Sequence, residues 1–200
     1  AAVILSTGLI SATGAQAALQ TRLGGLAVYD TDLNITWLAD ANANGLMDWA
    51  TANAWASGLT VGGFSGWRLP TTLQPDASCG LQGGGMSYGY SCTGSEMGHL
   101  FYTELGGAAG QSITTTHNIN YGLFQNVQSS GYWSGTEFAP SPGNAWDFNT
   151  LDGNLYAYNE SYYFYALAVR PGDVAAVPVP AAAWLLGSGL LGLMGVAWRR

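Results

Sequence analysis

The chain has 200 residues, a formal net charge of −7 at pH 7 and only 8% charged residues. It contains no lysine, and between Ala18 and Val177 three arginines stand against twelve acidic residues, a balance of −9. This balance argues against a nucleic-acid partner, because binding to phosphates needs basic side chains. Both ends are apolar, which leaves roughly 155 residues for the middle, enough for one domain with a hydrophobic core.

The N-terminal segment has the pattern of a secretion signal. Residues 1–10 are small and apolar, and Ala15-Gln16-Ala17 supplies the small-x-small pattern that signal peptidase recognises. We therefore predict a partial signal peptide over residues 1–17, cleaved after Ala17 or Ala18, with signal peptidase and the general secretion machinery as partners. A buried N-terminal helix is the alternative.

Two helices are predicted in the first half of the domain. Residues 47–58 carry apolar side chains at helical spacing, with Asp48 as N-cap and Gly58 at the C-cap. A second helix is signalled by Thr93-Gly94-Ser95-Glu96, which has the spacing of a capping box, and Gly106 is expected to end it.

Short strands precede and follow these helices. The strand-like runs are residues 26–30, 35–38, 131–138, 145–150, 154–159 and 165–170. Asp152-Gly153 is predicted to form a two-residue type I′ turn between two of them. The arrangement favours an α+β fold with an antiparallel sheet.

Six separated phrases of the domain resemble one known family. They are GLAVYDTDLNITWLADANANGLMDWATANAWASGL, GWRLPT, TGSEMGHLFYTELGG, YWSGTE, NAWDFNTLDG and YALAVRPGD. Together they cover residues 25–173 and resemble the C-terminal domain of the Legionella collagen-like protein, which is grouped with C-type-lectin-like folds and has no uniform activity. The resemblance implies that the first and last strands meet, so that residues 26–30 would lie beside residues 165–170.

The C-terminal segment is expected to cross a membrane. Residues 181–198 are mostly apolar and would span about 27 Å as a helix, and Arg199 and Arg200 follow them. The arginines should remain cytoplasmic, which places the preceding domain on the outer side. A buried core helix is the alternative.

This tail also resembles a known sorting signal. The segment VPVPAAAWLLGSGLLGLMGVAWRR is similar to the PEP-CTERM signal along its whole length, with Val177, Pro178, Val179 and Pro180 as the sorting motif and Val179 where glutamate is usual. The resemblance implies cleavage by an exosortase-type membrane protease in an exopolysaccharide-producing Gram-negative bacterium. The protein would then be exported to the cell envelope, cell surface or extracellular space after transient anchoring in the inner membrane. The combination of this domain with a PEP-CTERM tail in one chain is a familiar architecture.

Cys79 and Cys92 are the only cysteines. In an oxidising compartment we expect them to form a disulfide, which would stabilise the glycine-rich loop between them by roughly 3 kcal/mol. Free thiols or a metal or redox pair are the alternatives, although the spacing is not CxxC.

A calcium-loop-like pattern precedes the first helix. Asp40, Asn42, Asn44 and Asp48 stand at positions 1, 3, 5 and 9, but position 12 is Thr51 rather than glutamate. Calcium is therefore a possible cofactor, and an Asx-rich turn that ends in the Asp48 cap is the alternative.

The remaining polar candidates are interpreted as structural. His99 and His117 have no catalytic partner that the sequence assigns. Asp147 and Asp152 are expected to share no pocket, because one lies on a strand and the other in its turn. Glycosidase chemistry would need two carboxylates across a cleft.

Arginines and tyrosines offer the other candidates for binding. Arg68 and Arg170 are expected to tie loops to the sheet through carbonyls or a carboxylate, with substrate binding as the alternative. Most tryptophans should be in the core. Exposed aromatic rings stack well on sugars, and the candidates are Tyr156, Tyr158, Tyr162 and Tyr163.

The leading hypothesis is therefore a non-enzymatic ligand-binding or structural module, exported and associated with polysaccharide or another surface protein. The alternative is a secreted hydrolase or modifying enzyme with a site assembled from distant residues such as Glu96, His99 or Asp147. A third reading is a purely structural matrix component.

Overall fold

The computed structural model describes residues 18–174. The predicted signal peptide, sorting motif and membrane helix lie outside this range. Between residues 18 and 174, no helix has the length and apolar character needed to cross a bilayer.

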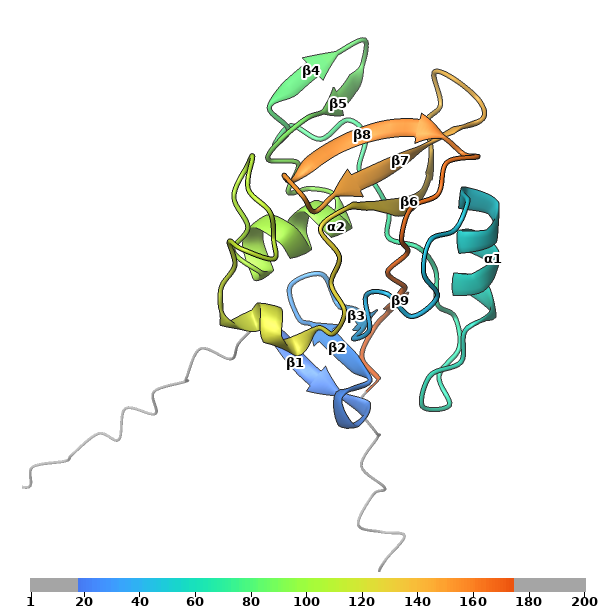
Figure 1. Cartoon of the computed structure of the whole chain (residues 1–200), viewed down its shortest axis with the longest axis vertical. Helices are drawn as coiled ribbons and strands as arrows, with labels where there is room; N and C mark the ends of the chain where they lie inside the picture. The colour runs from blue at the N-terminus through green and yellow to red at the C-terminus, as the bar shows by residue number, and fades with distance from the viewer. Residues whose placement is uncertain (1–17, 175–200) are drawn as a thin grey trace, which may run out of the picture.

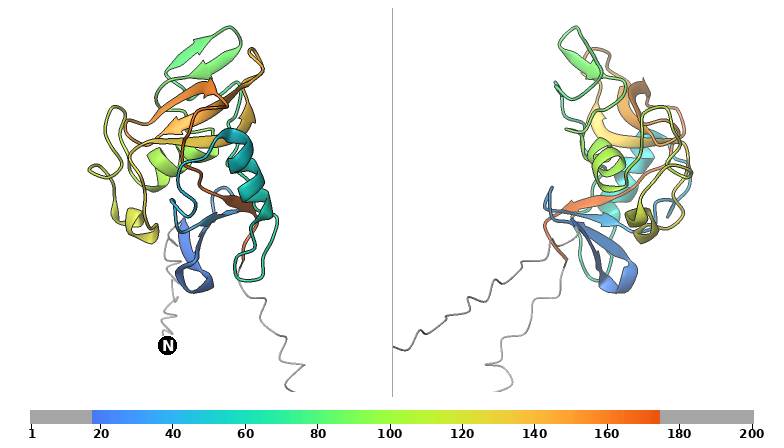
Figure 2. Two further views of the ribbon diagram at one scale, coloured as in Figure 1. Left: turned by 45° about the vertical axis from the view of Figure 1, so that its right-hand side comes forward. Right: turned by 90° about the vertical axis from the view of Figure 1, so that its left-hand side faces the viewer.

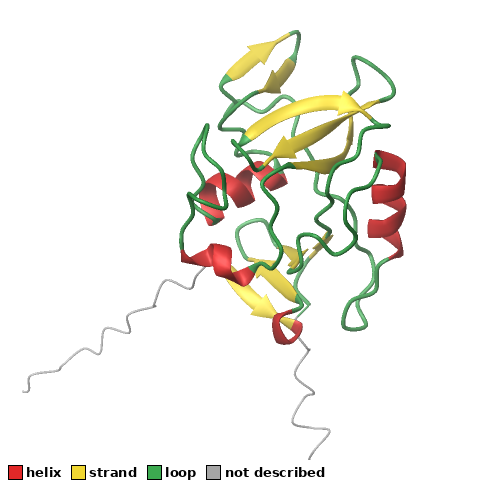
Figure 3. Ribbon diagram, viewed as in Figure 1, coloured by secondary structure: helices red, strands yellow, loops and turns green. Residues whose placement is uncertain are grey.

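The described part of the chain is a mixed α/β fold built mainly from antiparallel sheets (Figures 1 and 3). One sheet has the order β1-β2-β3-β9, formed by Leu19–Arg22, Ala27–Asp30, Ile35–Leu38 and Val169–Pro171. A second has the order β6-β7-β8, formed by Gly131–Glu137, Asn144–Asn149 and Asn154–Asn159. The hairpin β4-β5, formed by Leu81–Gly83 and Met86–Tyr88, lies at the opposite end of the molecule from β1 and β2 (Figure 2).

The first predicted helix is confirmed, although Gly58 is its last residue and Leu59 rather than Gly58 is the C-cap. Helix α1 (Trp49–Gly58) begins after Asp48, whose Oδ1 accepts a hydrogen bond of 2.8 Å from the backbone N–H of Thr51. This bond to the ionised form lowers the pKa of Asp48. Ala52 and Ala56 form the buried stripe of the helix, and their small side chains allow its backbone to approach the core.

The second helix is present in a different form. A short α2 (Glu96–Gly98) continues as a π-helix, η2 (His99–Glu104), and the N–H of Leu105 bonds to the carbonyl of Leu100 at 2.9 Å. Gly106 follows with a positive φ of 71°, as expected of a residue that ends a helix. The predicted capping box is wrong, because the Glu96 carboxylate reaches across to Arg68 instead.

The shorter helical turns are η1 (Leu23–Gly25) and η3 (Ile119–Leu123). Both are 3₁₀ segments in loops, and the Asn118 side chain caps the second by accepting from the N–H of Asn120.

The expected pairing of residues 26–30 with residues 165–170 is wrong, because β3 lies between them. β2 lies between β1 and β3, and the last strand, β9, pairs with β3 through Thr36 and Arg170. The turn after β2 explains this, because the Asp30 carboxylate accepts from the N–H groups of Asp32 and Leu33 and returns the chain as β3. β3 therefore pairs with β2 where the resemblance had placed the last strand.

The predicted strand over residues 165–170 divides between the two larger sheets. Tyr165 pairs with β6, where its carbonyl accepts from the N–H of Trp133 at 2.9 Å. Only Val169–Pro171 form β9, and Val169 also exchanges backbone hydrogen bonds with Arg68. This segment therefore links the sheets directly.

The turn between β7 and β8 differs from the predicted type I′ turn. Asn149 pairs with Asn154, so the loop has four residues, and only Gly153 among them has a positive φ. Thr150 follows the strand, and its single hydroxyl proton is shared between the carbonyls of Gln128 and Ser130. The loop then closes through the N–H of Gly153 and the carbonyl of Asn149 at 2.7 Å.

Aromatic side chains fill the core, as expected for most of the tryptophans. The largest fully buried side chains are those of Trp37, Trp133, Trp146, Tyr132, Phe101 and Phe148. The indole N–H of Trp133 donates to the carbonyl of Met47 at 2.9 Å, which satisfies its one buried polar group.

Covalent and ionic links complete the fold and confirm two predictions. Cys79 and Cys92 form a disulfide. The Arg68 guanidinium binds the Glu96 carboxylate through two contacts of 2.7 Å, and Arg170 donates to the carbonyl of Ser65. Both arginines therefore tie loops to the fold.

Candidate ligand-binding site on strands β7 and β8

One face of the β7–β8 hairpin carries a polar cavity of about 270 Å³. Alternate residues of a strand share a face, and the register places Asp147 opposite Tyr156 and Asn149 opposite Asn154. The residues that line this cavity, here called the β7–β8 cup, are Asp147, Asn149, Asp152, Asn154, Tyr156 and Tyr158.

Asp147 and Asp152 both line the cup, so the expectation that they share no pocket is wrong. The four-residue loop accounts for the difference, because it folds back through the bond between Gly153 and Asn149. Asp152 is held there by its own turn, in which its Oδ1 accepts from the N–H of Asn154 at 3.0 Å.

Asp147 is the most deeply placed acid of the cup. It is only 1% exposed, and its Oδ1 is buried without a hydrogen-bond partner among residues 18–174. Burial raises the pKa of Asp147 well above its usual value, and the nearby charge of Asp152 raises it further.

Asn154 presents a second acceptor of the same kind. Its Oδ1 is also buried and lacks a hydrogen-bond partner in the described part of the chain. Buried polar atoms are nearly always paired, because an unpaired one has lost water without replacement. The cup therefore contains two acceptors that a ligand with hydroxyl donors could satisfy.

Tyrosine rings flank these acceptors. The Tyr158 ring lies 5.6 Å from that of Tyr156 and 5.8 Å from that of Tyr162, measured between centroids, and packs against Phe164. Tyr156 and Tyr162 are about half exposed. The Tyr158 hydroxyl is a neutral donor at physiological pH, because tyrosine ordinarily has a pKa near 10, and burial raises the pKa of Tyr158 further.

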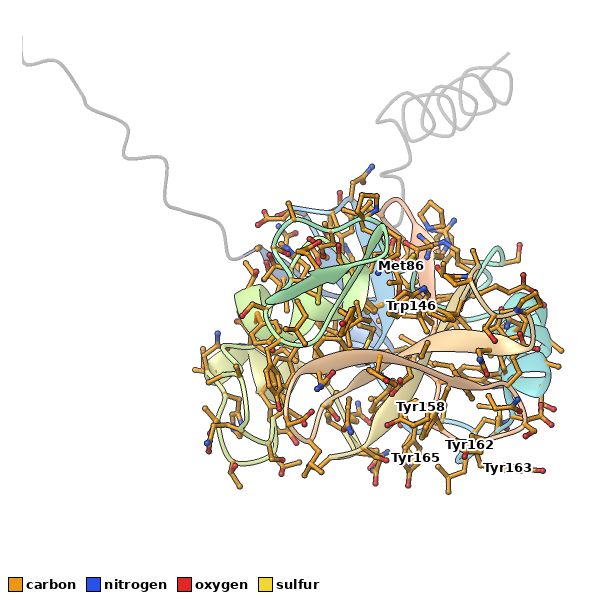
Figure 4. The ribbon with its side chains drawn as sticks, turned by 90° about the horizontal axis from the view of Figure 1, so that it is seen from above. Met86, Trp146, Tyr158, Tyr162, Tyr163 and Tyr165 are labelled. Atoms are coloured by element: carbon orange, nitrogen blue, oxygen red, sulfur yellow. A yellow bond between two sulfur atoms is a disulfide. The ribbon has the colours of Figure 1, made fainter. Side chains whose placement is uncertain are left out.

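The four tyrosines predicted to bind sugars do not all lie in the cup. Tyr156 and Tyr158 line the cup, and Tyr162 contacts Tyr158 beside it. Tyr163 is more exposed, at 64%, and is not among the lining residues. Figure 4 shows Tyr158, Tyr162 and Tyr163 on one side of β8, with Met86 and Trp146 on the other.

That other side carries a second, more apolar cavity of about 470 Å³ that the sequence did not indicate. Met86, Tyr88, Phe138 and Trp146 are among its lining residues, and Tyr156 lines both cavities. The indole N–H of Trp146 is buried without a hydrogen-bond partner in the described structure. The cavity depends on β4 and β5, which have no recognisable strand pattern in the glycine-rich loop.

The calcium-loop-like segment contains the hydrogen bonds expected of an Asx-rich turn, which is the alternative to a calcium site. Asp40 Oδ1 accepts from the N–H of Asn42 and from the side-chain amide of Asn126, both at 3.0 Å. Asp48 is engaged in capping α1, and the amide of Asn44 contacts the sulfur of Met47. Calcium binding at this segment stays a prediction.

The two histidines have different surroundings. His117 Nδ1 lies 2.6 Å from the carbonyl of Ile113, and its ring stacks on Tyr121 with a centroid distance of 4.0 Å. His99 Nε2 lies 3.3 Å from Glu104 Oε1. Neither residue lines the cup.

No protein-family model matches the chain, and no curated protein matches it. Its function is therefore inferred from the residues and their geometry.

Proposed function

We propose that the chain is an exported, non-enzymatic module that binds polysaccharide in the β7–β8 cup. The observation that supports this most strongly is the combination of two buried acceptors without partners, on Asp147 and Asn154, with exposed tyrosine rings beside them. A sugar ring offers hydroxyl donors at its edge and C–H groups on its faces, which suit acceptors and aromatic rings respectively.

The same proposal includes a C-type-lectin-like fold for the domain and export to the cell surface or extracellular space. Export is supported by the terminal segments of the sequence and by the disulfide, which persists in oxidising compartments. The domain would be carried by the signal peptide, anchored through residues 181–198 and processed by an exosortase-type protease at Pro178–Pro180.

Polysaccharide binding is tested with the full chain purified in mild detergent. A glycan array identifies the ligand, and titration calorimetry compares the wild type with Tyr158→Ala and Asp147→Asn. We expect Tyr158→Ala to weaken binding roughly 5- to 10-fold, and Asp147→Asn, which replaces one carboxyl oxygen by an amide NH2 group, to weaken it roughly 10-fold or more.

Tyr163→Ala is the matched control, since Tyr163 is an exposed tyrosine outside the cup. Its affinity should equal that of the wild type. The proposed site would be overturned if the wild type bound no bacterial polysaccharide on the array, or if Tyr163→Ala lost as much affinity as Tyr158→Ala.

A hydrolase is the second candidate because two carboxylates share the cup and one of them, Asp147, has a raised pKa. A carboxyl group that remains protonated can serve as a general acid toward a glycosidic oxygen. Release of reducing ends from an array-positive polysaccharide, abolished by Asp147→Asn, would replace the non-enzymatic reading with this one.

Export and processing are tested by intact-mass analysis of protein recovered from its own cells. We expect a mass with the signal removed at Ala17 or Ala18, the tail cut near Pro178–Pro180 and two hydrogens lost to the disulfide. Full-length cytosolic protein with both thiols reduced would contradict export.

A further inference from the structure

A cluster of ionisable side chains lies away from the β7–β8 cup, where the end of β2 meets the helical segment α2–η2. It consists of Asp30, His99 and Glu104, each of which contributes one donor atom within 4.8 Å of the others. Asp30 is fully buried, Glu104 is 4% exposed, and the side chain of His99 is 15% exposed. Figure 1 shows this helical segment between the two larger sheets.

The π-helix is what brings two of the three residues together. In an α-helix, residues five apart point to different sides, whereas the wider π-helix repeats close to that spacing. His99 and Glu104 are five residues apart, and η2 places Nε2 of one 3.3 Å from Oε1 of the other. Short π-helical segments are rare and occur often at functional sites.

The surrounding protein supplies little positive charge to balance two buried carboxylates. The chain has no lysine, and the three arginines of the domain have partners elsewhere. Arg22 binds Asp173, Arg68 binds Glu96, and Arg170 donates to backbone carbonyls. Burial of carboxylates is costly unless they are paired, protonated or bound to a cation.

The donor set is also suitable in kind for a metal ion, and the spacing of its His99–Glu104 pair fits one. One imidazole nitrogen and two carboxylate oxygens are ligands for zinc and related first-row divalent ions. Ligands 2.0–2.1 Å from a tetrahedral ion lie about 3.3 Å apart, which matches the His99–Glu104 distance. Asp30 Oδ1 accepts two backbone N–H groups, whereas Oδ2 has a single contact of 3.4 Å from Trp37 Nε1 and retains capacity for a further bond.

We propose that Asp30, His99 and Glu104 bind one divalent transition-metal ion of the zinc class. The ion enters from the side of His99, the most accessible of the three, and joins the turn after β2 to η2. Its role is to stabilise the contact between the β1-β2-β3-β9 sheet and the helical segment. The site shares no residue with the β7–β8 cup and is independent of polysaccharide binding.

The test uses the untagged full chain in mild detergent, stripped with a chelator and then dialysed. Zinc chloride is added, bound zinc is measured by elemental mass spectrometry, and affinity by calorimetry. We expect one equivalent of zinc, a rise of several degrees in Tm, and a tetrahedral visible absorption band when cobalt(II) replaces zinc. Calcium chloride should produce none of these, because calcium prefers six to eight oxygen ligands.

Variants assign the bound metal to this cluster. His99→Gln and Glu104→Gln should each weaken zinc binding at least 10-fold and remove the cobalt band, while His117→Gln, which changes the only other histidine, should leave both unchanged. Near-UV circular dichroism checks that each variant is folded. Absence of zinc uptake by the folded wild type, or full uptake by folded His99→Gln, would overturn the metal site. The cluster would then contain only a hydrogen bond between His99 and Glu104.

Discussion

Removing either partner of the Arg68–Glu96 pair should destabilise the domain, because this pair connects three segments. Glu96 Oε1 accepts from Arg68 Nη2 at 2.7 Å, while Oε2 accepts from Arg68 Nη1 and from the backbone N–H of Thr71, each at 2.7 Å. Arg68 Nη1 also donates to the carbonyl of Leu69. The hydrogen bonds that Arg68 donates to Glu96 accordingly raise the pKa of Arg68.

The expected magnitude follows from burial and charge. Unit charges 4 Å apart attract by about 4 kcal/mol at an effective dielectric of 20. The side chain of Arg68 is 35% exposed, so solvent screening and desolvation reduce the net coupling to about 2 kcal/mol. Glu96→Gln should then lower the free energy of unfolding by about 2 kcal/mol, and Arg68→Met by about 2–3 kcal/mol because Glu96 stays buried without its cation.

A double-mutant cycle measures this coupling. The wild type, both single variants and the double variant are unfolded in urea, and the double variant should be more stable than the sum of the single losses predicts. Their denaturant slopes should agree, which shows that the same unit unfolds in each case. A coupling energy below about 0.5 kcal/mol would refute the structural role assigned to the pair.

Three further changes test other parts of the fold in the same denaturation assay. Replacing both Cys79 and Cys92 by serine should cost about 3 kcal/mol, since the unfolded chain gains the entropy of a loop with a sequence separation of 13; an unchanged midpoint would contradict this. Gly98→Ala should cost about 3 kcal/mol or more, because the new Cβ would fall on the carbonyl of Cys92, whereas Gly58→Ala has no atom within 4 Å and should remain within about 1 kcal/mol of the wild type. The folded pKa of Asp147 is raised, so between the unfolded pKa of about 3.9 and the folded value the native state binds more protons than the unfolded state. Asp147 therefore makes the free energy of unfolding fall as pH increases across this interval, and Asp147→Asn should remove that fall. A wild-type stability that rises across that interval while the variant's does not would show that the assigned direction is wrong.

Local patterns in the sequence predict several elements correctly. β8, α1 and the Asp48 cap occur where predicted, and β2, β3, β6 and β7 agree to within one residue at each end. These elements have alternating apolar residues or a helical stripe with a cap, signals that lie within a few neighbouring residues. β1, β4 and β5 were missed because their short polar or glycine-rich sequences lack such alternation.

The candidate site was predicted only in part. Tyr156 and Tyr158 were named from the sequence, but Asp147 and Asp152 were not expected to share a pocket, because a two-residue turn was assumed. The actual loop depends on Thr150, whose hydroxyl binds carbonyls about twenty residues away in the chain. A bond of that kind has no local signature.

The apolar ends, the cysteine pair and the elements with regular hydrophobic spacing can all be predicted from the amino-acid sequence, because each depends on residue type or on near neighbours. Tertiary structure decided which strands adjoin, how the Asp30–His99–Glu104 cluster forms and which acceptors the β7–β8 cup leaves without donors. The strand order and the contact of Asp30 with His99 and Glu104 join residues tens of positions apart, and the burial of the cup acceptors exists only after the chain has folded.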